Sequence, residues 1–207
     1  MKIVVAIEGV DGSGKSSLAR AVYRLCQEHG RPCTAVGRRG ANASPLVVKL
    51  TRVLSEEGGN LTRAGDILIR LAREYQRADR AATTPDGVVV LDRFVLTVLA
   101  LVRENGQDMS ALLPFFNDII ARAGLHATIF AHCPFEVAYA RVTGRRPDSR
   151  TRRPGHEERL RKLADFMAKD FGRGLLTGQQ WPIDNSHDLA GAEQQLAAYL
   201  LPYLRDP

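Results

Sequence analysis

The residues at positions 9–16, GVDGSGKS, have the types and spacing of a phosphate-binding loop. Its glycines permit backbone angles that side chains disfavour, so the N–H groups of the loop can converge on phosphate oxygens. Lys15 would neutralise charge on the β- and γ-phosphates, and the Ser16 hydroxyl is a ligand for Mg²⁺. We therefore expect MgATP to bind here, through residues Gly9, Asp11, Gly12, Ser13, Gly14, Lys15, Ser16 and Ser17.

A second candidate group, Asp92-Arg93, follows the apolar residues 88–91. Because this stretch is typical of a buried strand, Asp92 should lie at its carboxyl end, beside the phosphate loop. There it could hold Mg²⁺ through water or accept a proton from an attacking hydroxyl. The alternative is a structural role as the N-cap of the next helix. Arg93 would face the transferred phosphate or a substrate phosphate.

Arginines gather in a third region, where residues 144–155 have no apolar periodicity and indicate a loop or lid. Arg141 and Arg145 are four positions apart, so they share one face if the preceding helix reaches that far. We expect Arg141 to bind the nucleotide, and Arg145 and Arg146 to close over it and stabilise the migrating phosphoryl group while excluding water. A solvated basic loop is the alternative.

These groups need a framework, and the hydrophobic pattern supplies one. Apolar strands alternating with amphipathic helices predict a parallel sheet covered on both faces, with ligands at the carboxyl ends of the strands. The expected strands are 3–7, 33–36, 88–91, 127–131 and 181–184, and the expected helices are 16–28, 45–54, 64–82, 95–103, 110–123, 135–142, 157–171 and 189–201.

Length and composition limit the class of protein. A chain of 207 residues with 44% hydrophobic residues favours a single compact domain, 1–207. No apolar run is long enough to span a membrane, no signal peptide is apparent, and the three cysteines are widely spaced. We expect a cytoplasmic protein with free thiols. The net charge is +6, but aromatic residues make up only 6%, which argues against a nucleic-acid partner.

Two motifs typical of GTPase switches are missing from the sequence. The residues after the strand 88–91 are DRFV, without the glycine of an Asp-x-x-Gly motif, and no Asn/Thr-Lys-x-Asp motif occurs. A kinase acting on a small molecule is therefore favoured over a switch. A nucleotide-binding module without catalysis and a nucleic-acid end kinase are the alternatives.

Several of these stretches together resemble the thymidylate kinases. Residues 7–17, IEGVDGSGKSS, are similar to the opening of that family, Asp92-Arg93-Phe94 to its Asp-Arg-aromatic motif, and Arg73 to its phosphate-binding arginine. The resemblance implies a three-layer α/β/α P-loop kinase fold with a five-stranded parallel sheet, an Arg-rich lid at about 143–156 and often a homodimer. It also implies transfer of the ATP γ-phosphate to a nucleoside monophosphate, with Arg73 and Arg93 on the acceptor phosphate and Asp11 on a sugar hydroxyl.

The sequence departs from this family where a base would be read. Of the family's Arg-Glu-Pro-Gly-Gly only Arg38 matches, and Ile69 replaces a phenylalanine that stacks on thymine. Thr97 stands for the serine after the Asp-Arg motif, whereas Val102 replaces a glutamine that reads the base. A site without its polar groups cannot read a base edge. The acceptor is thus open between dTMP, another nucleotide, a nucleoside and a specialised metabolite.

Overall fold

The structure is a computed structural model, and it describes residues 2–36, 86–104, 106, 113–122, 124–145, 155–174 and 178–205. Five strands form one parallel sheet, as the sequence predicts, and the structure gives their order as β2-β3-β1-β4-β5. Their bounds are β1 Ile3–Glu8, β2 Cys33–Val36, β3 Val88–Asp92, β4 Ala127–His132 and β5 Gln179–Asp184.

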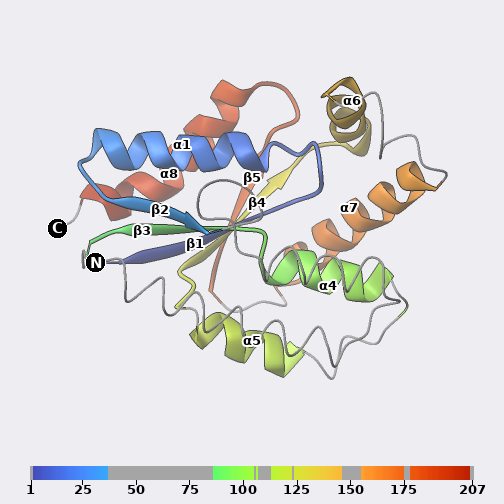
Figure 1. The fold of residues 1–207 in the computed structure, drawn as a ribbon, viewed down its shortest axis with the longest axis horizontal. Helices are drawn as coiled ribbons and strands as arrows, with labels where there is room; N and C mark the ends of the chain where they lie inside the picture. The colour runs from blue at the N-terminus through green and yellow to red at the C-terminus, as the bar shows by residue number, and fades with distance from the viewer. Residues whose placement is uncertain are drawn as a thin grey trace.

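Helices cover both faces of the sheet, because the central strands are apolar on both sides (Figure 1). Ile3, Val5 and Ile7 of β1 belong to one core cluster, with α1 (Lys15–Glu28) and α8 (Leu189–Arg205). The alternate residues of β1 belong to a second cluster on the opposite face. That cluster includes side chains of α4 (Val95–Glu104), α5 (Leu113–Arg122) and α7 (His156–Gly172).

Two helices run further than the sequence predicts. The helix α6 (Phe135–Arg145) includes Arg145, which the sequence analysis placed in the lid. The helix α8 continues through Pro202. A proline interrupts one hydrogen bond, but Leu200 and Leu204 are buried against the sheet on either side of it. The predicted helices 45–54 and 64–82 lie outside the described residues, as does most of the expected lid.

The phosphate loop lies where β1 ends and α1 begins, at the edge formed by the carboxyl ends of the strands (Figure 1). The parallel register pairs Ile7 of β1 with Asp92 of β3. This pairing brings the end of the strand before the loop to the end of the strand that carries Asp92. Among the helices that the structure describes, none is long and apolar enough to cross a membrane.

Candidate active site

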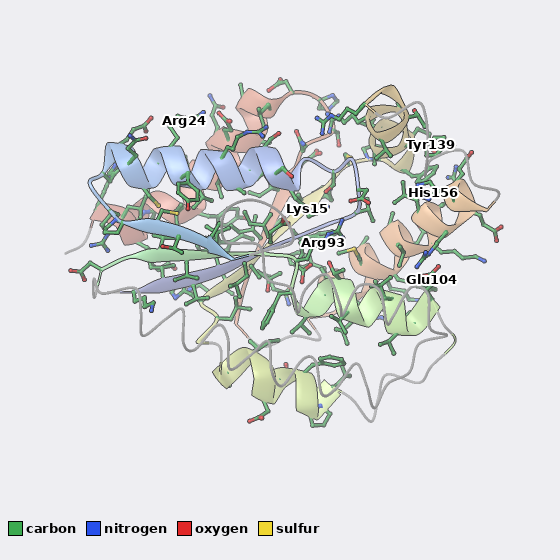
Figure 2. The ribbon with its side chains drawn as sticks, viewed as in Figure 1. Lys15, Arg24, Arg93, Glu104, Tyr139 and His156 are labelled. Carbon is green, nitrogen blue, oxygen red and sulfur yellow. The ribbon has the colours of Figure 1, made fainter. Side chains whose placement is uncertain are left out.

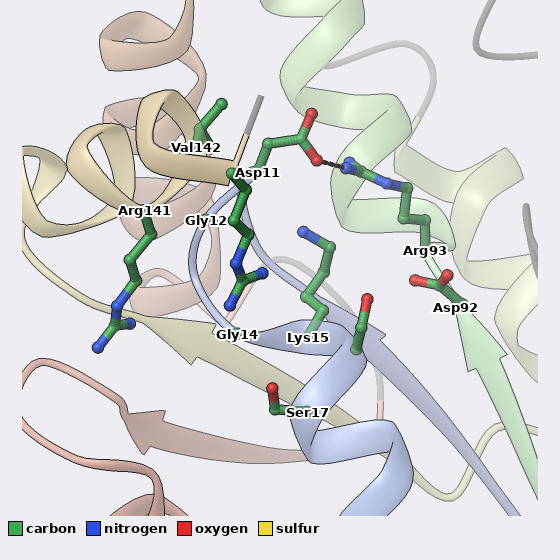
Figure 3. A pocket seen from close by; sticks show the side chains of 11 residues that line it. Asp11, Gly12, Gly14, Lys15, Ser17, Asp92, Arg93, Arg141 and Val142 are labelled. Atoms are coloured by element: carbon green, nitrogen blue, oxygen red, sulfur yellow. Dashed lines mark hydrogen bonds and ion pairs between the residues drawn. The ribbon is translucent and has the colours of Figure 1, made fainter. Parts of the chain in front are cut away.

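A cavity of about 190 Å³ lies at this edge of the sheet, between the phosphate loop, the end of β3 and the last turn of α6 (Figure 3). It brings together ten of the predicted site residues and one other, Val142. The lining residues are Asp11, Gly12, Gly14, Lys15, Ser16, Ser17, Asp92, Arg93, Arg141, Val142 and Arg145.

The loop passes so close to neighbouring backbone that its glycines are required. Gly12 has φ +88°, and a Cβ there would lie 2.1 Å from the carbonyl oxygen of Ala138 in α6. Gly14 has φ +98°, and a Cβ there would lie 2.0 Å from the side-chain nitrogen of Asn185. A side chain at either position would therefore clash with α6 or with Asn185 after β5. Glycine at both positions allows the loop to pack this closely against them.

Lys15 is the central cation of the cavity, yet only 7% of it is exposed. Its ammonium group donates a hydrogen bond of 2.6 Å to the carbonyl oxygen of Val10 within the loop. Burial, and then the positive charge of Arg93, lowers the pKa of Lys15 to about 7. Its charge is therefore sensitive to anything that adds negative charge to the cavity.

Arg93 reaches the cavity from the end of β3, and Figure 2 shows it close to Lys15. It has φ 69°, an uncommon value for a residue with a side chain, and its N–H donates to the Ile7 carbonyl oxygen at 3.1 Å. This turn directs its guanidinium group to the carboxylate of Asp11, with which it forms an ion pair. Such a conformation persists only where surrounding contacts fix it.

Glu8, at the end of β1, provides those contacts. Its buried carboxylate accepts N–H hydrogen bonds from Phe94 at 2.9 Å, Leu96 at 2.8 Å and Thr97 at 3.3 Å, and the Thr97 hydroxyl at 2.5 Å. It therefore takes up the N–H groups at the start of α4 that a helix leaves unpaired. Burial raises the pKa of Glu8, whereas the hydrogen bonds from Thr97 and Phe94 lower it. The role of Glu8 could not be predicted from the sequence, because its partners lie more than 80 positions away.

This geometry bears on the two roles considered for Asp92, a role in the phosphate chemistry and a role as helix N-cap. Because Glu8 accepts from the first N–H groups of α4, the helix start does not depend on Asp92. Asp92 instead lines the cavity together with Ser16. A hydroxyl and one carboxylate suit Mg²⁺, which is commonly bound by few protein oxygens together with phosphates and water. Among the residues that the structure describes, no group of three or more His, Cys, Asp or Glu side chains could hold a metal ion by itself.

Arg141 and Arg145 both line the cavity, on the same face of α6, as their spacing predicts. Arg141 donates to the Asn185 carbonyl oxygen at 2.9 Å. Arg145 lies on the last turn of the helix, so the helix rather than a loop positions it. Arg146, the other predicted catalytic arginine, lies outside the described residues.

Of the predicted site residues that the structure describes, three are absent from the cavity lining. Gly9 and Ser13 are buried within the loop, where a Cβ on Gly9 would lie 2.5 Å from the Ser13 hydroxyl. Thr97, expected to contact the acceptor, is buried, and its hydroxyl donates to Glu8. Its observed contact is therefore structural. The remaining predicted acceptor residues, Arg38, Ile69 and Arg73, lie outside the part of the chain that the structure describes.

Comparison with known proteins identifies the family of the chain. A family model described as thymidylate kinase matches residues 7–178. The chain belongs to the thymidylate kinase family. It is 31% identical over 153 residues to a thymidylate kinase of Symbiobacterium thermophilum, covering 72% of this chain and 71% of the relative. A thymidylate kinase of Bdellovibrio bacteriovorus is 31% identical over 181 residues, covering 85% and 81%.

A solved structure extends the comparison to the whole fold. The deoxyadenosine kinase from M. mycoides with bound dCTP superposes with a TM-score of 0.61, covering 98% of this chain and 100% of that one. At 14% identity, this similarity shows the fold alone. Membership of the thymidylate kinase family makes the protein a phosphotransferase of the nucleotide kinase class.

Proposed function

We propose that this protein transfers the γ-phosphate of MgATP to the phosphate of a nucleoside monophosphate. One observation carries the proposal: cations enter a single cavity from two sides, Lys15 from the phosphate loop and Arg93 from the end of β3. A phosphate donor on the loop and an acceptor phosphate on Arg93 would then share that cavity. Phosphoryl transfer depends mainly on such positioning and on charge stabilisation.

Each side chain has a defined task in this proposal. The loop N–H groups and Lys15 hold the β- and γ-phosphates, and Arg93 orients the acceptor. Ser16 and Asp92 would hold Mg²⁺, which when bound neutralises charge on the donor phosphates. Arg141 and Arg145 approach the donor from α6 and add positive charge as the phosphoryl group moves.

The first acceptor to test is dTMP, because the named relatives are thymidylate kinases. Val102 is a reason to test acceptors other than dTMP as well. It stands where the family has a base-reading glutamine, and it is 1% exposed within the apolar core. That position offers no polar group to a base, so a different acceptor could be preferred over dTMP.

The decisive experiment measures ADP release and ³¹P NMR product formation with MgATP and a panel of acceptors. The panel contains dTMP and other nucleoside monophosphates, the matching nucleosides and a single-stranded oligonucleotide. Product formed only with a monophosphate supports the proposal. Tight ATP binding without acceptor-dependent ADP release would instead indicate a non-catalytic nucleotide-binding module, and dependence on the oligonucleotide an end kinase.

A further inference from the structure

Asn185 follows β5 directly and is only 4% exposed, yet it has no role in the scheme above. Its side-chain amide donates a hydrogen bond of 2.8 Å to the carbonyl oxygen of Ser13 in the phosphate loop. The same nitrogen occupies the space into which a Cβ on Gly14 would project. The amide thus lies directly against the peptide that joins Ser13 to Gly14.

The backbone of Asn185 is fixed independently of its side chain. Its N–H donates to the carbonyl oxygen of His132 at the end of β4, at 2.9 Å. Its own carbonyl oxygen accepts the 2.9 Å hydrogen bond from Arg141. One residue therefore connects the ends of two strands, the phosphate loop and a cavity arginine.

The bond to Ser13 has a geometric consequence for the next amide. The carbonyl of Ser13 and the N–H of Gly14 belong to one planar trans peptide, so they point in opposite directions. Holding the carbonyl on Asn185 therefore directs the Gly14 N–H away from Asn185. Gly14 lines the cavity, and loop N–H groups are the phosphate ligands in our proposed function.

We propose that Asn185 is a positioning residue for the ATP phosphates, because its amide fixes the orientation of the Ser13–Gly14 peptide. The inference rests on the proposed function, since it assigns the Gly14 N–H, oriented in this way, to a phosphate of ATP. An aspartate at this position could not donate to the Ser13 carbonyl, and it would add negative charge near the phosphates. An alanine would leave that buried carbonyl oxygen without its partner.

The test compares Asn185→Ala and Asn185→Asp with Gln195→Ala. Asn185→Ala keeps both backbone contacts, to His132 and Arg141, and removes only the amide. Gln195 bonds to the backbone of Asp184 through both ends of its side chain, at 2.9 and 3.1 Å. Its removal thus perturbs the residue next to Asn185 without touching the loop, which makes Gln195→Ala a matched control for stability.

We expect Asn185→Ala to weaken ATP binding in calorimetry by roughly five- to tenfold, the effect of losing about one hydrogen bond, and Asn185→Asp to weaken it further. The KM for the phosphate acceptor should stay within about twofold in both variants. Gln195→Ala should lower Tm comparably while ATP affinity is retained. Unchanged ATP affinity in Asn185→Ala, or equal weakening in Gln195→Ala, would overturn the inference.

The same experiment separates this inference from the proposed function. Wild-type protein that binds ATP but phosphorylates no monophosphate contradicts the function only, because ATP affinity still reports on Asn185. If Asn185→Ala does not fold, ¹⁵N NMR of the wild-type protein decides the question. The Gly14 amide resonance should shift on ATP addition, and an unshifted resonance at saturating ATP would refute the assignment.

Discussion

Arg93 and Asp11 form an ion pair across the cavity, although 82 positions separate them in the sequence (Figure 3). The pair joins the phosphate loop to the turn between β3 and α4. Arg93 is mostly buried and Asp11 is more than half exposed, so the arginine is the better fixed of the two. Asp11 thus holds the guanidinium group in the cavity, where our proposal places the acceptor phosphate.

Replacement of Arg93 should damage acceptor use selectively. We expect Arg93→Ala to lower kcat/KM for the nucleotide acceptor by about 100-fold, because a charge-assisted hydrogen bond contributes about 1.5–3 kcal/mol. The affinity for ATP should change less than about threefold. Steady-state kinetics with each substrate varied would measure both values. Arg24→Ala, which breaks an ion pair with Glu193 on the surface, is the control and should behave as wild type.

Lys15→Ala should abolish phosphoryl transfer and leave the fold intact. The cavity would lose its central cation. Stability should not fall at neutral pH, since the lowered pKa of Lys15 means that burying its charged form costs free energy. Turnover assays and circular dichroism melting curves measure the two effects. Wild-type turnover in this variant would refute the mechanism.

ATP binding should weaken as pH rises above neutral. With a pKa of about 7, Lys15 is largely uncharged at pH 8–9, so a triphosphate that needs its charge must bind together with a proton. We expect affinity to fall by up to about tenfold per pH unit in this range. Calorimetry in two buffers of different ionisation enthalpy would detect the proton uptake. The Lys15→Met variant should show neither the proton uptake nor the dependence of ATP affinity on pH. If the pH dependence persists in this variant, another group causes it.

Glu8→Gln should destabilise the protein although it removes no volume. Each carboxylate oxygen of Glu8 accepts two of the four hydrogen bonds. In glutamine an NH₂ group replaces one of these oxygens, and it would face two donors instead of accepting from them. Leaving these buried donors unpaired should lower the free energy of unfolding by about 2–4 kcal/mol. Urea denaturation measures this loss, and Glu28→Gln on the exposed end of α1 is the control. Equal stability of the two variants would contradict the role of Glu8.

Arg145 and Arg146 should act on turnover more than on ATP binding. If they stabilise the moving phosphoryl group, neutralising Arg145 and Arg146 together should lower kcat by about 10³-fold. ATP affinity should fall by less than about tenfold. Single-turnover kinetics would measure the rate of phosphoryl transfer separately from the affinity for ATP. An unchanged kcat would favour the alternative of a solvated basic loop.

Short-range patterns in the sequence were sufficient to predict much of the fold and of the phosphate loop. The five strands follow from apolar runs, and the loop from Gly9 to Ser16 follows from residue types whose backbone and charge requirements are local. The spacing of Arg141 and Arg145 likewise predicted their common face, because helix periodicity is a local property. Helix ends were less predictable, since burial of Leu200 and Leu204 carries α8 past Pro202.

The contacts of Glu8 and Asn185 were decided only by the tertiary structure. Glu8 contacts residues that the parallel pairing of β1 with β3 brings beside it, and Asn185 contacts a loop 172 positions earlier in the chain. Glu8 lies in the stretch that resembles the opening of the thymidylate kinases, but its position in the sequence does not identify its partners, and Asn185 belongs to no local pattern. The chemistry of the phosphate loop is thus encoded in eight consecutive residues, whereas the orientation of its amides and of Arg93 depends on contacts that exist only once the parallel sheet has formed.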